Sequence, residues 1–102
     1  MPVLPSEIDD AKFKFNEDEY INELLDYVKS TYSKHYATRS GKQTIENIIE
    51  NGYGEGFCMG NIEKYVGRYG KKEGRNRADL IKMSHYAILM LYIHDQEYGD
   101  EK

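Results

Sequence analysis

The chain has 102 residues, of which 39% are hydrophobic, 31% are charged and ten are tyrosine, and its formal net charge is −4. This length predicts one domain with a modest core, and the single cysteine excludes an internal disulfide and a metal site made of cysteines alone. The sequence shows no signal peptide and no apolar run of the roughly 18 residues that span a bilayer. We therefore expect a cytoplasmic protein with no membrane partner.

Charge is distributed unevenly along the chain. Residues 1–27 carry eight acidic side chains and two lysines, whereas residues 64–77 carry six cations and only Glu73 as an acid. The acidic balance disfavours general nucleic-acid binding, but the local cluster of cations suits phosphate groups.

The first 15 residues contain both prolines and predict an extended or flexible arm that docks through Phe13 and Phe15. A single domain is expected over 16–98. Its first helix spans 17–33, with Asn16 as N-cap and Glu19 as the capping-box partner. The segment 34–42 lacks periodicity and is expected to be a loop.

A short helix containing Ile45, Ile48 and Ile49 is expected to end at Asn51 and Gly52, because glycine suits the left-handed position after a helix. A glycine-rich link then leads into a helix over 55–69 that ends at Gly70. Within that helix, Gly60 and Gly67 each cost about 1 kcal/mol relative to alanine. This cost predicts that the backbone approaches another helix or a ligand closely there.

The last helix is expected over 77–97, with Asn76 as N-cap and Asp79 near its positive end. Residues 86–93 are apolar nearly all round, which is typical of a core helix or a subunit contact, and we expect a homo-oligomer formed through this helix. Residues 99–102 are expected to fray. The fold class is therefore all-α, a compact four-helix domain whose helix 17–33 runs antiparallel to its neighbours.

The stretch 57–72 carries the densest mix of small, aromatic and cationic residues. On a helix, Asn61, Lys64 and Arg68 share one face, and Cys58 lies on a neighbouring apolar stripe as a small buried hydrophobe. No Gly-x-x-x-x-Gly-Lys-Ser/Thr motif is present, so phosphates would have to be held by side chains. The alternative is that these cations pair with Glu63, Glu73 and Asp79 on a solvated surface.

Several short motifs over 33–93 together resemble a small domain of unknown function that is widespread in tailed bacteriophages and prophages. The motifs are His35-Tyr36, Gly41-Lys42, Ile45-Glu46, Ile48-Ile49-Glu50, Phe57-Cys58-x-Gly60-Asn61-x-x-Lys64-Tyr65-x-x-Arg68-x-Gly70-Lys71-Lys72, Asp79-Leu80-x-Lys82 and Tyr86. This chain departs from the family pattern by a slightly longer spacing between Gly41 and Ile45. One named member of that family is a phage nucleotide kinase that acts on deoxynucleoside monophosphates.

The resemblance implies a phage-encoded protein, located in the cytoplasm of an infected bacterium, that binds or acts on nucleotides. The residues expected to bind a nucleotide are His35, Tyr36, Asn61, Lys64, Arg68, Lys71 and Lys72. A kinase-like reaction would need Mg²⁺ and a nucleoside triphosphate, and the residues leave open whether the protein is an enzyme. Glu46 and Glu50 could bind Mg²⁺ or simply form an exposed polar face. The alternative function is a non-catalytic module that sequesters a host nucleotide signal or binds a host protein.

Overall fold

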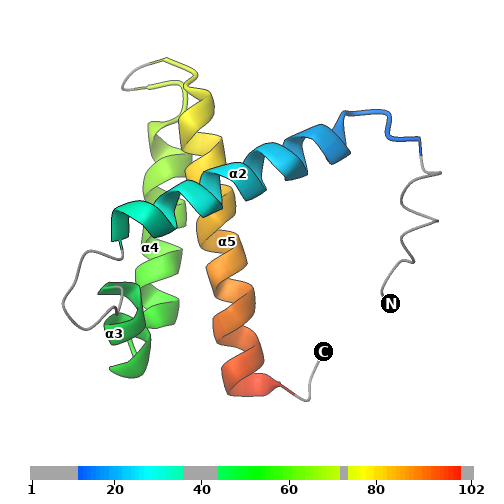
Figure 1. Ribbon diagram of the computed structural model, residues 1–102. Coiled ribbons are helices and arrows are strands. Elements are labelled where there is room, and N and C mark those ends of the chain that lie inside the picture. Colours follow the sequence, from blue (N-terminus) through cyan, green and yellow to red (C-terminus); the bar gives the residue numbers. More distant parts are fainter. Residues whose placement is uncertain (1–11, 36–43, 72–73, 100–102) are drawn as a thin grey trace.

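The computed structural model of the chain describes residues 12–35, 44–71 and 74–99. These residues form four α-helices in the order α2 (Glu17–His35), α3 (Thr44–Glu50), α4 (Gly54–Arg68) and α5 (Arg77–Tyr98) (Figure 1). No strand occurs within the described ranges. The prediction of an all-α, four-helix fold is confirmed.

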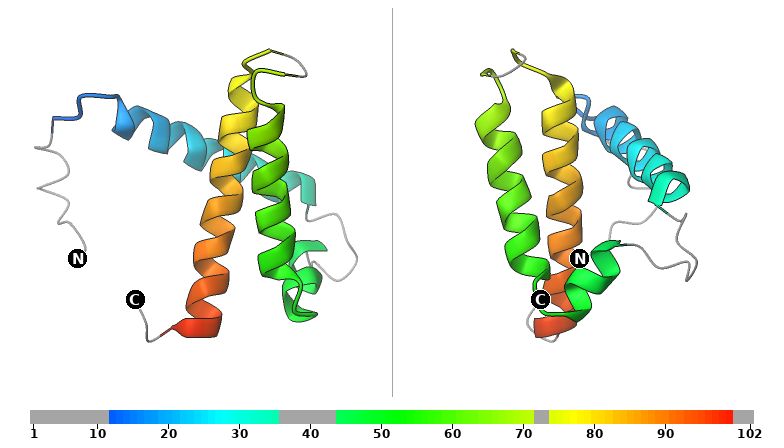
Figure 2. Two further views of the ribbon diagram at one scale, coloured as in Figure 1. Left: turned by 180° about the vertical axis from the view of Figure 1, so that it is seen from behind. Right: turned by 90° about the vertical axis from the view of Figure 1, so that its left-hand side faces the viewer.

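Helices α4 and α5 form an antiparallel hairpin and lie side by side in every view (Figures 1 and 2). The buried side chains of the described residues come from these two helices, with Cys58 and Tyr65 on α4 and Asp79 and Ile93 on α5. The core therefore lies in the α4–α5 seam.

Two helix ends were predicted correctly from the sequence. At the end of α3, Gly52 adopts φ 85°, and the N–H groups of Gly52 and Tyr53 donate to the carbonyls of Ile49 and Ile48. This is the Schellman arrangement, which satisfies the last carbonyls of a helix. At the start of α5, Asn76 is the N-cap and its Oδ1 accepts from the N–H of Ala78 at 2.9 Å.

Helix α2 begins at Glu17, as predicted, but the conformation of its N-terminal cap and its C-terminal end differ from the prediction. Asn16 adopts φ 59°, a left-handed conformation, whereas an N-cap residue of a capping box is extended. The backbone N–H of Phe15 donates to Oε1 of Glu17 at 2.9 Å, so the capping carboxylate is that of Glu17 and not that of Glu19. Helix α2 also continues to His35, two residues past the predicted end, so the backbone of His35 is helical and does not begin a loop.

The predicted antiparallel arrangement of the first helix was wrong, because α2 crosses the α4–α5 hairpin and its N-terminal half projects beyond α5 (Figures 1 and 2). The apolar residues of α5 are spread around the helix rather than confined to one face, so its sequence defines no single stripe that would fix the direction of a neighbouring helix. Packing against the hairpin decides this direction.

The expectation that Gly60 and Gly67 mark a close helix approach was also wrong. A Cβ atom built on either residue would meet nothing within 4 Å. The close approach occurs at Gly54, where a Cβ would lie 2.9 Å from Cδ1 of Ile93 and 3.0 Å from Cγ1 of Ile49. Glycine at position 54 therefore lets α3, α4 and α5 converge.

The described part of the predicted arm begins at Lys12, and the arm does not dock through its phenylalanines, since Phe13 and Phe15 are both exposed. The rest of that arm, over 1–11, and the end of the predicted tail, over 100–102, lie outside the described residues. None of the described helices is long and apolar enough to cross a membrane.

Candidate functional site

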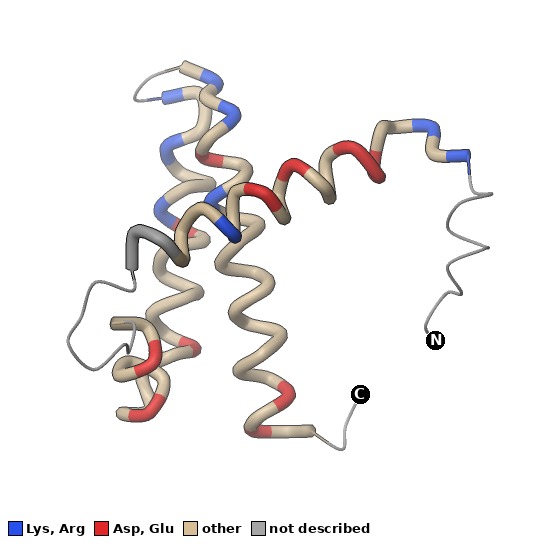
Figure 3. The backbone as a smooth tube through the Cα atoms, in the orientation of Figure 1, with Lys and Arg blue, Asp and Glu red and all other residues tan. Residues whose placement is uncertain are grey.

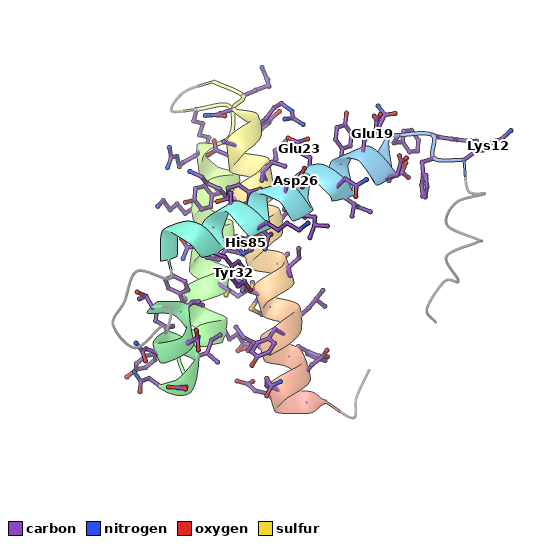
Figure 4. All side chains as sticks on the ribbon, viewed as in Figure 1. Lys12, Glu19, Glu23, Asp26, Tyr32 and His85 are labelled. Carbon is purple, nitrogen blue, oxygen red and sulfur yellow. The ribbon has the colours of Figure 1, made fainter. Side chains whose placement is uncertain are left out.

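A cavity of about 220 Å³ lies where α2 crosses the hairpin, close to α3. All four helices contribute to its wall, and Tyr32 and His85 mark the crossing in Figure 4. Its lining is mostly aromatic and aliphatic and comprises Tyr27, Thr31, Tyr32, Thr44, Ile45, Ile48, Phe57, Tyr65, Lys82, His85, Tyr86 and Leu89. We call this cavity the aromatic pocket.

The rings of the aromatic pocket contact one another in a continuous cluster centred on Tyr86. Its ring stacks on that of Tyr65, with centroids 6.1 Å apart, and meets that of Phe57 edge to face at 5.9 Å. His85 stacks beside Tyr86 and receives Tyr27 of α2 edge to face at 5.6 Å. Such pairs add stability beyond their buried area, so the cluster holds the pocket wall in a defined shape.

Burial in this cluster raises the pKa of the Tyr27 and Tyr86 phenols, and the nearby Tyr65 raises both further. Both hydroxyls are therefore neutral at physiological pH and can donate hydrogen bonds into the pocket. Burial likewise raises the pKa of the Cys58 thiol, whose residue is 0% exposed. The prediction that Cys58 is a small buried hydrophobe is confirmed.

Three cations surround the ring of Tyr65, one wall of the aromatic pocket. The Nζ atoms of Lys64 and Lys82 lie 5.1 and 5.5 Å from the ring centroid, and Cζ of Arg68 lies at 5.8 Å. These distances are within the range of cation–π attraction, which holds the cations near the ring. Of the three, Lys82 lines the aromatic pocket itself, whereas Lys64 and Arg68 contact the ring of Tyr65 and are not among the lining residues.

Arg68 is oriented by a buried carboxylate. Its Nε lies 3.9 Å from Oδ1 of Asp79, a residue that is 5% exposed. The same Nε is buried and has no hydrogen-bond partner among the described residues. The Asp79 carboxylate therefore attracts the inner side of the guanidinium, while the side chain as a whole stays partly exposed.

This arrangement suits a ligand that has a flat apolar part and an anionic part. The rings offer faces and edges against which a planar heterocycle can stack. The lysines supply point charges and arginine supplies a planar fork, and both recognise phosphate. The aromatic walls alone would not attract the anionic part of such a ligand, whereas the three cations would.

The residues that sequence reasoning assigned to a nucleotide site are only partly brought together. Lys64 and Arg68 meet at Tyr65, whereas Lys71 lies exposed in the turn after α4. The Nδ2 of Asn61 donates to the Phe57 carbonyl of its own helix at 2.9 Å. The side chain of His35, and both Tyr36 and Lys72, lie outside the described residues.

Sequence reasoning missed Lys82 and the aromatic walls, although Phe57, Tyr65, Lys82 and Tyr86 all stand in the motifs quoted above. A usable signal was present, because Lys82 and Tyr86 are four residues apart and so share one face of a helix. The high tyrosine content was a second signal. What the sequence could not show is that α2 crosses at this point and closes the cavity with Tyr27 and Tyr32.

The carboxylates considered for Mg²⁺, Glu46 and Glu50, lie exposed on α3. Within the described ranges, no three histidine, cysteine, aspartate or glutamate side chains are grouped so that they could hold a metal ion.

Fold and site together define a small all-α domain with an aromatic pocket, one of whose wall residues, Tyr65, is contacted by three cations. Residues 30–88, more than half of the chain, match the family described as protein of unknown function DUF3310. The chain therefore belongs to the DUF3310 family. No curated protein and no solved structure matches it.

Proposed function

We propose that the protein binds a nucleotide, with the base in the aromatic pocket and the phosphates against Lys64, Arg68 and Lys82. The observation that carries this proposal is the gathering of three cations around Tyr65, which is itself a wall of the pocket. A purely apolar ligand would make no use of these cations, and a free phosphate would make no use of the rings.

Two parts of the proposal rest on the family resemblance rather than on the site. These are that the protein is phage-encoded and that it acts in nucleotide metabolism in the cytoplasm of an infected bacterium. Phosphoryl transfer would need Mg²⁺ and a nucleoside triphosphate together with groups that position them. Binding is the part of the proposal that the described lining residues support, because they supply rings and a lysine.

The second candidate is sequestration of a host nucleotide signal without turnover. It is favoured by the same lining, because aromatic walls and fixed cations are sufficient for tight binding. Binding of a host protein would use the surface of the molecule rather than this pocket.

The test is calorimetric titration of mono-, di-, tri- and cyclic nucleotides, with and without Mg²⁺, into the wild type and three variants. Lys82→Ala and Arg68→Ala are each expected to weaken binding at least tenfold, which corresponds to about 1.4 kcal/mol. Lys14→Ala is the matched control, because Lys14 is an exposed cation in the segment before α2 (Figure 3). It should bind like the wild type.

Circular dichroism of each variant separates lost binding from lost folding, which matters most for Arg68 because its removal leaves Asp79 buried alone. Saturable binding with Mg²⁺-dependent product formation would support a kinase-like enzyme. Equally tight binding without product would support sequestration. If no nucleotide binds the folded wild type, or if Lys14→Ala weakens binding as much as Lys82→Ala, the proposed site is wrong.

A further inference from the structure

The described residues expose far more apolar surface than they bury. Fifteen large hydrophobic side chains are exposed, whereas the buried hydrophobic ones are Cys58, Tyr65 and Ile93. Exposed apolar residues that gather in one patch mark sites of protein–protein contact.

One continuous part of this surface runs along α5, on the side opposite to α4. Ile93 faces the hairpin seam and is 3% exposed, whereas Ile88, Leu91 and Tyr92 are 43%, 66% and 54% exposed. Leu80, Ser84, Ile88 and Leu91 follow one another at steps of three or four residues, so they lie on one helix face. We call this face the α5 stripe.

The N-terminal half of the α5 stripe forms one wall of an open groove of about 590 Å³, and the projecting half of α2 forms the other. The α2 wall contains Glu17, Tyr20, Ile21 and Leu24, and the α5 wall contains Arg77, Leu80, Ile81 and Ser84. The C-terminal half of the stripe continues out of this groove and has no helix over it in Figures 1 and 2. Each molecule thus presents an apolar groove and, directly below it, an apolar ridge.

The charges at the two ends of the stripe have opposite sign. Arg75 lies just before α5 and is followed by Arg77, which is paired with Glu23 of its own chain, whereas Asp95 lies near the C-terminal end of the helix (Figure 3). A two-fold axis through the middle of the stripe would place the basic end of one copy beside the acidic end of the other. The apolar residues would meet between these ends, and the helix dipoles would oppose each other.

We propose that two copies of the chain associate through their α5 stripes, with the helices antiparallel about a two-fold axis near Ser84 and Ile88. The C-terminal half of each α5, with Ile88, Leu91 and Tyr92, lies in the groove between α2 and α5 of the other copy. In this arrangement the projecting half of α2 packs against the α5 helix of the partner. It also makes α5 a central helix of the assembly, covered by α4 on one side and by the partner on the other.

A second copy fits this surface better than an unrelated partner. The stripe is complementary to itself in both charge and shape, whereas an unrelated protein would have to reproduce both features.

The test is sedimentation equilibrium of the wild type and of three variants that each place a carboxylate on an exposed apolar residue. An isologous contact predicts a wild-type mass that is an even multiple of the protomer. Leu91→Glu and Ile21→Glu, one on the ridge and one on the groove wall, are each expected to reduce that mass at least twofold. Val66→Glu is the matched control, because Val66 is 56% exposed on α4, away from the stripe. It should leave the mass unchanged.

Cysteine cross-linking tests the antiparallel geometry directly, because a residue near a two-fold axis meets its own copy. The native Cys58 is fully buried and so gives a low background. Ile88→Cys is expected to form a disulfide-linked dimer under mild oxidation, and Val66→Cys is expected to remain monomeric on a non-reducing gel.

Three results would overturn the proposal. The wild type could be monomeric at all concentrations or contain an odd number of chains. Val66→Glu could disrupt the assembly while Leu91→Glu, shown to be folded by circular dichroism, leaves it intact. Ile88→Cys could fail to cross-link in a sample that sediments as an oligomer.

Discussion

The α4–α5 hairpin and helix α2 differ in how they are held. The hairpin contains the buried side chains of the described residues, including Cys58, Tyr65 and Ile93. Helix α2 is longer than α4, yet none of its side chains over 17–32 is buried. The hairpin is therefore a packed unit, and α2 is laid against it.

What holds α2 is a small set of contacts near the crossing. Tyr27 packs edge to face on His85, and Arg77 donates two hydrogen bonds to the carboxylate of Glu23 at 2.7 and 2.8 Å. The same guanidinium lies 6.0 Å from the ring centroid of Tyr20. Because α2 forms a wall of both the aromatic pocket and the groove, we infer that a ligand and a second copy of the chain each add to its stability.

This comparison predicts that the largest single loss of stability comes from the hairpin seam. Ile93→Ala removes a buried side chain from that seam and is expected to lower the free energy of unfolding by about 3 kcal/mol. Val66→Ala truncates an exposed side chain of α4 and should change it by less than about 0.5 kcal/mol. Urea unfolding at one fixed protein concentration measures both. Similar losses in the two variants would show that the seam is not the core.

A smaller loss is expected where the three helices α3, α4 and α5 converge. Gly54→Val forces a side chain against Ile93 and Ile49 and should cost about 2 kcal/mol. The same substitution at Gly60, where nothing lies within 4 Å, should stay within about 0.5 kcal/mol of the wild type. Thermal melts of the two variants provide the comparison. If Gly54→Val melts like the wild type, the three helices do not pack closely at this position.

The smallest effect is expected from the ion pair that ties α2 to the hairpin. The hydrogen bonds that Arg77 donates hold the pKa of the Glu23 carboxyl below its ordinary value of 4.5. A depressed pKa means that the pair stabilises the fold above the unfolded pKa, and that this contribution disappears as pH falls through the folded pKa. Since both groups are exposed, salt should also weaken it.

Melting temperatures of the wild type and Glu23→Gln, measured from pH 7 to pH 3, test this prediction. The wild type should melt slightly higher at neutral pH, and the difference should vanish on acidification and shrink in high salt. A difference that stays constant across this range would show that the ion pair does not fix α2.

The helix ends show which parts of the fold can be predicted from local sequence. Asn76 and Gly52 were identified correctly, because a side chain that accepts a nearby N–H and a residue that tolerates positive φ act over a few residues. Asn16 directly precedes α2, as predicted, but it takes the left-handed conformation that this residue type tolerates instead of the extended conformation of a capping box. Short-range interactions therefore predict the position of a helix terminus more reliably than the backbone conformation of the residue that caps it.

The candidate site shows the same division. Lys64 and Arg68 could be placed together from their spacing on one helix, and the structure brings both to Tyr65. Lys82, which completes the group, lies on another helix, and Tyr27 and Tyr32, which close the pocket, lie on a third. Spacing along one helix carries no information about side chains that come from another.

The sequence by itself determined the all-α class, the positions of the helices and the presence of a cationic segment, because periodicity, capping and charge are local properties. Only the tertiary structure decided that α2 crosses the hairpin rather than running along it. That crossing creates both the aromatic pocket and the groove beside the α5 stripe. It could not be predicted because the apolar residues of α5 are spread around the helix, and such a helix attracts a neighbouring helix without fixing its direction.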